Sequence, residues 1–330
     1  MDNNYRIIDN YIRSGDKAHD EGNLIKALNY YLRAEELLEG ERDIDLIISI
    51  ALMLDELGDT EKAKEKYEEA LSINSFEVRA YYGLAVIYDE KEDYVKAIEL
   101  YKKAIDINPV YDRAIFFLAN ALDNVGDKEG AIEYYQKTIE VCKEDFWAHI
   151  NLGSIYEERD MLQEAYRMFS KALQIDGEHY LALFNMGVIY KRLNVYDKAK
   201  KFYEKAIKKN FGYAFSFLNL AVIYKEENNI EKGIEILSLG LRFNPENHFL
   251  YYNRSCFKAI LGNDLEDATE DLIKAVEFYP EFIKYINKDN DLIEVRNSNK
   301  FKSFLETLDS GYFQYLRSFK LQLNTIIYKN

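Results

Sequence analysis

The chain contains few residues that cross-link a fold or interrupt helices. Its 330 residues include only two cysteines, Cys142 and Cys256, and three prolines. Two cysteines so far apart provide neither a disulfide framework nor the paired ligands of a zinc site. The scarcity of proline leaves long stretches in which a helix can continue without interruption. These absences favour a helical protein of a reducing compartment.

Long apolar runs are also missing. The N-terminal segment has no apolar core of the kind that a signal peptide carries, and the longest apolar run, around residues 46–54, is short. A membrane-spanning helix needs roughly 20 apolar residues. We therefore expect a cytoplasmic protein with no membrane partner. The tripeptide Asn253-Arg254-Ser255 matches a glycosylation acceptor, but without secretion the match is accidental.

Positive charge is in deficit along the chain. Lysine and arginine number 43 against 58 aspartate and glutamate residues, which gives a formal net charge of −15. This charge repels nucleic-acid phosphates and anionic lipid. We expect no nucleic-acid partner, and a basic or neutral protein partner is favoured instead.

Motifs that carry catalysis are missing as well. The sequence has no phosphate-binding loop, nucleophile elbow, His-Glu-x-x-His zinc helix or dinucleotide-binding glycine fingerprint. No histidine lies near a cysteine or carboxylate in a recognised catalytic order. All four histidines are expected at the surface: His19, His149, His179 and His248. We expect no enzymatic activity, no cofactor and no metal site.

The sequence does contain a repeat, which is clearest from Tyr180 to Lys209. Apolar and small residues recur at helical spacing in each half of this stretch, which predicts two amphipathic helices. Asn194 lies between the halves and belongs to the few residue types that tolerate left-handed backbone. The stretch therefore predicts an antiparallel helical hairpin.

Small residues mark three positions in every copy, at nearly constant intervals. In the second helices they are Ala27, Ala63, Ala97, Ala131, Ala165, Ala199, Gly233 and Ala268, and a second set follows two helical turns later at Ala34, Ala70, Ala104, Thr138, Ala172, Ala206, Gly240 and Ala275. In the first helices they are Gly15, Ala51, Ala85, Ala119, Gly153, Gly187, Ala221 and Cys256. Large rings alternate with them at Tyr31, Tyr67, Tyr101, Tyr135, Phe169 and Tyr203. Helices touch closely at such sites, where a larger side chain costs roughly 1–3 kcal/mol.

Turn residues support the same division into helix pairs. The position between the two helices carries residues that suit left-handed backbone, with Glu92 as the exception. These residues are Gly22, Gly58, Gly126, Asp160, Asn194, Asn228 and Asn263. Pro109, Pro245 and Pro280 all follow a second helix, where proline prevents the helix from continuing.

A period of about 34 residues with these features resembles the tetratricopeptide repeat family. The resemblance implies an all-α, right-handed α-solenoid superhelix over residues 1–282, with eight repeats beginning near Ile8. Residues 283–330 are expected to form a helical cap, because the last repeat of a solenoid would otherwise expose an apolar face. The cap is expected to include an Asp-rich turn, an Arg and a Phe-x-x-Leu helix over Asp289 to Leu305, then an amphipathic segment from Gly311 onward that carries Tyr315 and Phe319. A helix that recruits a partner is the alternative for this segment.

In this family the first helices line a concave groove. By that resemblance the residues facing the groove are Arg79, Tyr82, Arg113, Phe116, Trp147, Ile150, Leu181, Phe184, Phe215, Leu218 and Phe257. An exposed row of aromatic rings indicates a binding surface. Partial burial against the neighbouring repeat is the alternative. Asn151, Asn185 and Asn219 recur once per repeat and resemble the asparagine ladders that hold peptide backbone in some relatives.

Charge is unevenly distributed along the predicted groove. Carboxylates dominate repeats 1 to 5, at Asp9, Asp16, Asp20, Asp45, Asp55, Glu56, Asp89, Glu90, Asp123, Glu157 and Glu158. The basic residues Lys191, Arg192 and Lys225 follow near repeat 6. This distribution predicts a bound segment that carries lysine or arginine. A solvated charged face that maintains solubility is the alternative for the carboxylates.

These expectations favour a non-catalytic scaffold that holds an extended peptide or protein segment in its groove. One alternative is a peptide-responsive regulatory sensor whose superhelix changes shape on binding, although no DNA-binding helix-turn-helix precedes the repeats. Another is the targeting module of a glycosyltransferase-type assembly, although no catalytic domain follows them. The sequence does not specify the oligomeric state.

Overall fold

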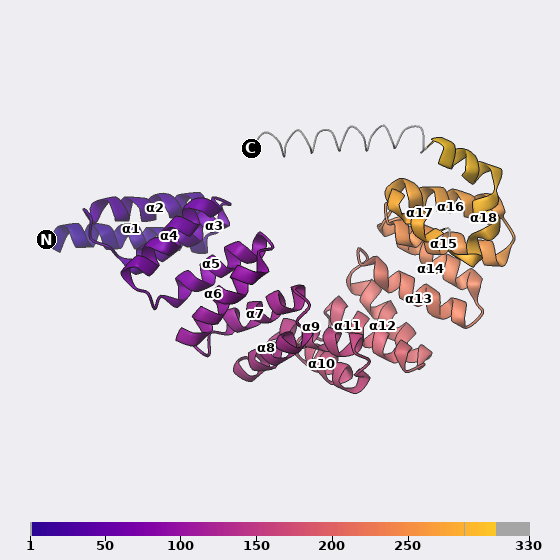
Figure 1. Ribbon diagram of the computed structural model, residues 1–330, viewed down its shortest axis with the longest axis horizontal. Helices are drawn as coiled ribbons and strands as arrows, with labels where there is room; N and C mark the ends of the chain where they lie inside the picture. The colour runs from indigo at the N-terminus through magenta and orange to yellow at the C-terminus, as the bar shows by residue number, and fades with distance from the viewer. Residues whose placement is uncertain (1, 287, 308–330) are drawn as a thin grey trace. The chain divides into compact units, whose positions relative to one another are not determined.

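The computed structural model describes residues 2–286 and 288–307, which fall into two compact units, residues 1–168 and 169–330. Helices and short loops make up the described residues, and none of these residues lies in a strand (Figure 1). The predicted all-α class is confirmed. The boundary between the units lies within one helix, α10 (Leu162–Ile175).

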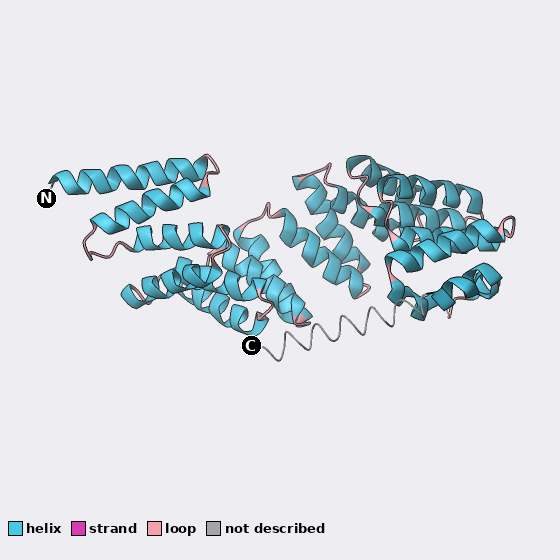
Figure 2. Cartoon of the chain, turned by 90° about the horizontal axis from the view of Figure 1, so that it is seen from above, coloured by secondary structure: helices cyan, strands magenta, loops and turns pink. Residues whose placement is uncertain are grey.

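Sixteen helices follow one another in pairs over the described part of residues 2–278 (Figure 2). The pairs in the first part of the chain are α1 (Asp2–Asp20) and α2 (Leu24–Leu37), α3 (Ile44–Glu56) and α4 (Thr60–Ile73), α5 (Val78–Glu90) and α6 (Tyr94–Ile107), and α7 (Asp112–Asn124) and α8 (Lys128–Val141). The next are α9 (Phe146–Glu158) and α10 (Leu162–Ile175), α11 (Tyr180–Arg192) and α12 (Tyr196–Lys209), α13 (Ala214–Glu226) and α14 (Ile230–Phe243), and α15 (His248–Leu261) and α16 (Leu265–Phe278). The pairs are eight in number, as the sequence predicts, but the first begins at Asp2 rather than near Ile8.

The turn between the paired helices uses left-handed backbone at a constant position. Glu92, Asn194 and Asn228 have φ values of 59°, 56° and 58°, and glycines occupy the corresponding position of several other repeats. In the last repeat the sequence places Asn263 in this role, which is wrong, because Gly262 has the positive φ of 69°. The extra residue of this repeat therefore follows the left-handed position.

The same change of register corrects which residue of α15, the first helix of the last repeat, takes the position predicted to be small. Ser255, rather than Cys256, lies one repeat period after Ala221. Ser255 is fully buried, and its hydroxyl donates to the Ala268 carbonyl oxygen at 2.6 Å. The Ser255 hydroxyl of α15 is therefore hydrogen-bonded to α16, at a position where the other first helices carry a small apolar residue.

Close packing within the pairs has the predicted pattern of small and large residues. All the predicted small positions are buried, and Tyr31, Tyr67, Tyr101, Tyr135, Phe169 and Tyr203 are buried as well. A Cβ atom added to Gly187 would lie only 2.7 Å from the Tyr203 ring. Because interiors are packed to the density of organic crystals, this ring excludes any larger residue at that site.

The stretch after α16 packs into the core of the second unit. It forms the short helices η1 (Pro280–Phe282), α17 (Ile283–Ile286), η2 (Asn290–Leu292) and α18 (Ile293–Asn297), and residues 299–307 are helical. Phe282, Ile286, Leu292, Val295 and Phe301 are buried in the cluster that includes Leu272 and Val276 of α16. The segment from Gly311 with Tyr315 and Phe319, which the sequence assigns to the cap, lies outside the described residues.

Candidate functional site

First helices of successive pairs contact one another within each unit. In the first unit α3 contacts α5, and in the second α11 contacts α13, which contacts α15. We use the term first-helix surface for the side of each unit formed by α1, α3, α5, α7 and α9, or by α11, α13 and α15. The predicted binding residues belong to these helices.

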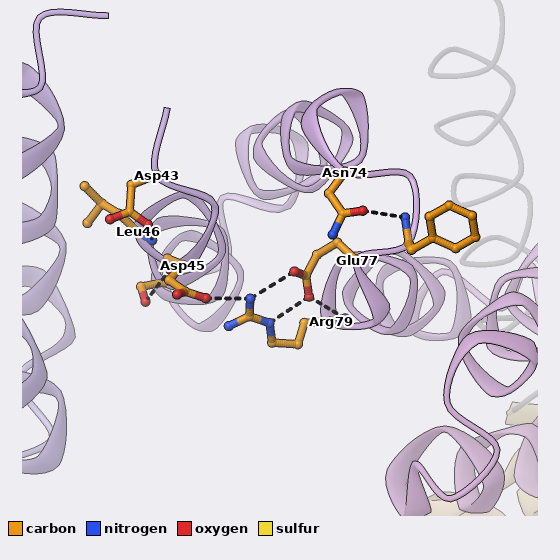
Figure 3. A network of polar contacts seen from close by, with 8 residues as sticks. Asp43, Asp45, Leu46, Asn74, Glu77 and Arg79 are labelled. Carbon is orange, nitrogen blue, oxygen red and sulfur yellow. Dashed lines mark hydrogen bonds and ion pairs between the residues drawn. The ribbon is translucent and has the colours of Figure 1, made fainter. Parts of the chain in front are cut away.

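Arg79, a predicted binding residue, is held by two carboxylates of the first unit (Figure 3). Its Nε lies 2.7 Å from Glu77 Oε1, and its Nη2 lies 2.7 Å from Asp45 Oδ1 of α3. The hydrogen bond and charge of Arg79 lower the pKa of Glu77. The guanidinium therefore joins α3 to the start of α5, and both of these interactions are internal.

Buried tyrosines donate hydrogen bonds to polar side chains of the first helices. Tyr31 donates to Asp16 Oδ1 at 2.8 Å, and Tyr101 donates to Asp89 Oδ2 at 3.1 Å. Tyr135 donates to Asn120 Oδ1. Because a buried hydroxyl needs a partner, these carboxylates and amides complete the hydrogen bonding of the core as well as facing outward.

The predicted acidic residues of the first unit lie in different electrostatic settings. Their side chains are half-buried at Asp55, Asp89, Asp123 and Glu157, and exposed at Glu56, Glu90 and Glu158. Burial, followed by the charges of Glu90 and Glu56, raises the pKa of Asp55, and its buried Oδ1 has no hydrogen-bond partner among the described residues. Lys128 pairs with Asp123 at 2.7 Å and with Glu158 at 2.9 Å. The charges that act on Asp55 are therefore those of other carboxylates, Glu90 and Glu56.

The predicted basic residues differ in how they are engaged. Lys225 Nζ lies 2.8 Å from Asp291 Oδ2 of η2, so the stretch after α16 supplies its partner. Its ammonium also lies 5.5 Å from the centre of the Phe257 ring. Lys191 is half-buried, whereas Arg192 and Arg113 are exposed. Lys225 therefore ties α13 to η2.

The repeated asparagines do not share one environment. Asn151 Nδ2 donates to Asn120 Oδ1 at 3.0 Å and to the Tyr135 hydroxyl at 3.2 Å, so this amide belongs to the tyrosine network of the first unit. Asn219 Nδ2 donates instead to the Phe215 carbonyl oxygen of its own helix at 3.0 Å. Asn185 is half-buried in α11.

The corrected register of the last repeat reveals a fourth asparagine at this position, which the sequence interpretation missed. Asn253 lies one repeat period after Asn219, and it donates to the Phe249 carbonyl oxygen at 2.8 Å in the same way. The glycosylation-type tripeptide and the misplaced register of this repeat concealed it. Phe249 was missed for the same reason, although it lies one repeat period after Phe215.

The predicted aromatic row is only partly exposed. Trp147 and Phe215 are exposed, whereas Tyr82, Phe116, Leu181 and Phe184 are half-buried. Phe184 packs against Tyr203 and Tyr213, with ring centres 5.6 and 5.1 Å apart. Packing within the repeats therefore uses much of this ring surface.

Three residues assigned to the groove are core residues instead. Ile150, Leu218 and Phe257 are buried, so their placement in a groove is wrong. For Ile150 and Leu218 the physical reason is that the inward stripe of a first helix is wider than the small residues alone indicate. In the corrected register Phe257 takes the position of the buried Ile223. His149, expected at the surface, is likewise buried; it occupies the position of Leu183 in the next repeat, and its Nδ1 lies 2.8 Å from the Asp145 carbonyl oxygen.

An aromatic pocket of about 670 Å³ lies in the second unit. It is lined by residues of α15 and of the stretch that follows α16: His248, Phe249, Tyr252, Asn253, Tyr279, Phe282 and Tyr285. Sequence analysis missed it because the two stretches meet only in the folded chain. Among the residues that the structure describes, no His, Cys, Asp and Glu side chains cluster as a metal site, and no helix is long and apolar enough to cross a bilayer.

Family models match half of the chain. Three models, each described as tetratricopeptide repeat, match residues 44–76 and 112–145, residues 78–111, and residues 144–210. No curated protein matches the sequence. The matched residues contain helices α3 to α12, in which the repeat period is most regular.

Solved structures share the fold. The Cut9–Hcn1 hetero-tetramer of APC/C has a TM-score of 0.56 at 14% identity over 86% of this chain and 52% of that chain, so the present chain spans about half of it. A Pseudomonas aeruginosa protein, pilF, has a TM-score of 0.53 at 18% identity over 70% of this chain and 97% of its own. YrrB, described as having an unusual peptide-binding site, is 27% identical over 56% of this chain and 95% of its own, with a TM-score of 0.49. At these identities the first two matches support the fold alone.

Proposed function

This chain belongs to the tetratricopeptide repeat family, whose members are typically non-catalytic protein-interaction scaffolds, and on this premise we propose that it binds an extended peptide segment along its first-helix surface. A stack of hairpins presents a long surface at little folding cost, because each repeat needs only its neighbours. The occupant is a protein or peptide with a basic segment, since the chain carries a net charge of −15.

The observation that carries the proposal is the repeated asparagine of the second unit. Asn219 and Asn253 each use one amide hydrogen to hold a carbonyl oxygen of their own helix. This bond restrains the side chain and leaves the amide oxygen and the second hydrogen available to a ligand. A peptide backbone offers complementary groups at every residue, whatever its sequence.

Exposed rings accompany these amides at a constant offset. Phe215 and Phe249 each precede the asparagine by one helical turn, so ring and amide lie on the same face of the helix. The two ring centres are 6.2 Å apart. Amides for the backbone beside rings for the side chains provide affinity with moderate specificity.

Replacement of Asn185, Asn219 and Asn253 by alanine tests the proposal. Peptides would first be selected from a random library on the immobilised full chain, and their affinity then measured by calorimetry. Each lost hydrogen bond costs roughly 0.5–1.5 kcal/mol, so the triple variant should bind about tenfold or more weakly with an unchanged melting curve.

Asn151→Ala is the matched control. Its amide bonds to Asn120 and Tyr135, so the variant should lose stability while peptide affinity stays near that of the wild type. A library that yields no binding peptide, or equal affinity in the triple variant, would contradict the proposed mode.

A further inference from the structure

The aromatic pocket of the second unit is built from two stretches of chain. The first two turns of α15 supply His248, Phe249, Tyr252 and Asn253, and the stretch after α16 supplies Tyr279, Phe282 and Tyr285. Its volume of about 670 Å³ admits one long side chain together with its backbone. The pocket adjoins the asparagine row, because Asn253 is a member of both.

Phe282 forms the base of the pocket and the other rings stand around it. Its ring meets those of Tyr252 and Phe249 edge to face, with centres 4.7 and 5.6 Å apart. Phe282 is only 7% exposed, whereas Phe249, Tyr279 and Tyr285 are 38%, 41% and 63% exposed. The buried Phe282 ring packs in the core of the unit. The exposed rings present aromatic surface that packing inside the unit does not use.

The side chains that line the pocket favour a cation. No lysine or arginine is among the described residues that line it. Burial lowers the pKa of His248, so the imidazole is neutral at pH 7 and adds no positive charge. The faces of phenyl and phenol rings carry the negative part of a quadrupole, which attracts ammonium and guanidinium groups.

A carboxylate bonded to one of the lining rings adds to their attraction for a cation. The Tyr252 hydroxyl donates to Asp289 Oδ2, so negative charge lies at the far end of a lining ring. Arg296 donates to two main-chain oxygens of the same turn, those of Ile286 at 3.2 Å and Asp289 at 3.0 Å. Lys284 pairs with Glu281 at 3.7 Å, which offsets the positive charge that α17 carries.

We propose that this pocket holds the side chain of an arginine or lysine from the bound segment through cation–π contacts with Phe249, Tyr279 and Tyr285. The inference rests on the proposed function and specifies the chemistry of one anchor. Asn253 then binds the backbone of the anchoring residue. A purely apolar side chain would pack against the rings but gain nothing from their quadrupoles.

Short peptides provide the test on the full chain. The probes are acetylated, amidated Gly-Gly-X-Gly-Gly peptides, with X arginine or its neutral isostere citrulline, and lysine or norleucine. Binding is followed by NMR of the chain with labelled tyrosine, and Tyr279 and Tyr285 report on the pocket. The arginine peptide should bind at least fivefold more tightly than the citrulline peptide and shift these resonances.

Substitutions that keep the pocket apolar separate the ring faces from simple burial. The double variant F249L/Y279L should lose the preference for arginine over citrulline and keep the wild-type melting curve. Phe76→Leu removes a ring that is 71% exposed and lies outside the first helices and the pocket, and it should leave the preference unchanged.

Two outcomes would overturn the inference: equal binding of arginine and citrulline peptides, which would define an apolar pocket, or no shift of the pocket tyrosines. Failure here differs from failure of the proposed function. Library peptides that depend on Asn185, Asn219 and Asn253 but tolerate F249L/Y279L would contradict the cation pocket and leave binding by the asparagines supported.

Discussion

At the scale of single residues, the turns show where backbone geometry and residue type disagree. Glycine, asparagine and aspartate adopt the left-handed conformation at low cost, and they occupy most of the turns between paired helices. Glu92 adopts it as well, with φ of 59°, although its Cβ is crowded in this conformation. The fold, rather than local preference, therefore determines the backbone at this position.

Glu92→Gly should stabilise the protein. Left-handed backbone costs a residue with a Cβ roughly 1–2 kcal/mol, and the greater freedom of glycine in the unfolded chain cancels about 0.5–1 kcal/mol of that gain. We expect a net gain of about 0.5–1 kcal/mol, visible as a small rise in Tm. Glu92→Ala retains the Cβ and is the control. Equal Tm values for the two variants would show that strain at this turn is negligible.

Asp55 illustrates a cost of a different kind. Its raised pKa means that the folded chain holds a proton more tightly than the unfolded chain does. The charged carboxylate is therefore unfavourable to folding at neutral pH, and this cost fades as pH falls through the folded-state pKa. A carboxylate kept at such a position concentrates negative potential on the first-helix surface.

At the scale of elements, the stretch after α16 completes the last repeat. It buries Phe282, Leu292 and Phe301 against α15 and α16, and Asp291 pairs with Lys225 of α13. Without it, the apolar faces of these helices would meet water. It also supplies three of the rings that line the aromatic pocket. One segment thus covers the core and shapes a candidate binding site.

Deletion of residues 281–330 should destabilise the second unit. Each buried Leu or Phe side chain that it removes contributes roughly 1.5–3 kcal/mol. We expect aggregation or a lower Tm, measured by light scattering and a thermal melt. Deletion of residues 308–330 alone is the control, since it retains every contact described here. A monodisperse 1–280 chain with the wild-type Tm would exclude a capping role.

At the scale of the whole molecule, net charge of −15 affects how a partner approaches. Carboxylates of the chain itself already engage the cations of Arg79 and Lys225, whereas Asp55 Oδ1 has no hydrogen-bond partner among the described residues. Long-range attraction of a basic segment follows from the net charge of −15.

Salt titration tests that attraction. A selected peptide rich in lysine or arginine should bind several-fold more weakly at physiological salt than at low salt, because the screening length falls to about 8 Å. The same peptide with arginine replaced by citrulline should show a smaller dependence in the same calorimetric titration. Affinity that ignores ionic strength would argue against electrostatic attraction.

The sequence by itself was enough to predict the helix pairs and their packing. Positions such as Ala199, Gly187 and Asn194 recur at a constant interval, and each repeat needs only local contacts, so the period specifies the fold. The period was misapplied in the last repeat, where one extra residue follows Gly262, so positions extrapolated back from Ala268 into α15 are displaced by one residue; this hid Asn253 and Phe249.

Tertiary structure alone decided which polar groups remain available to a ligand. Arg79 meets Asp45 of the preceding repeat, and Lys225 meets Asp291 beyond the last repeat. Asn151 joins a tyrosine network in the same way, whereas Asn219 and Asn253 bond within their own helices. The aromatic pocket likewise needs α15 and the stretch after α16 to meet. A repeat pattern shows only the features that neighbouring repeats have in common. Contacts such as those of Arg79 with Asp45 and of Lys225 with Asp291 join pairs of residues that do not recur together from repeat to repeat, so the pattern does not predict them.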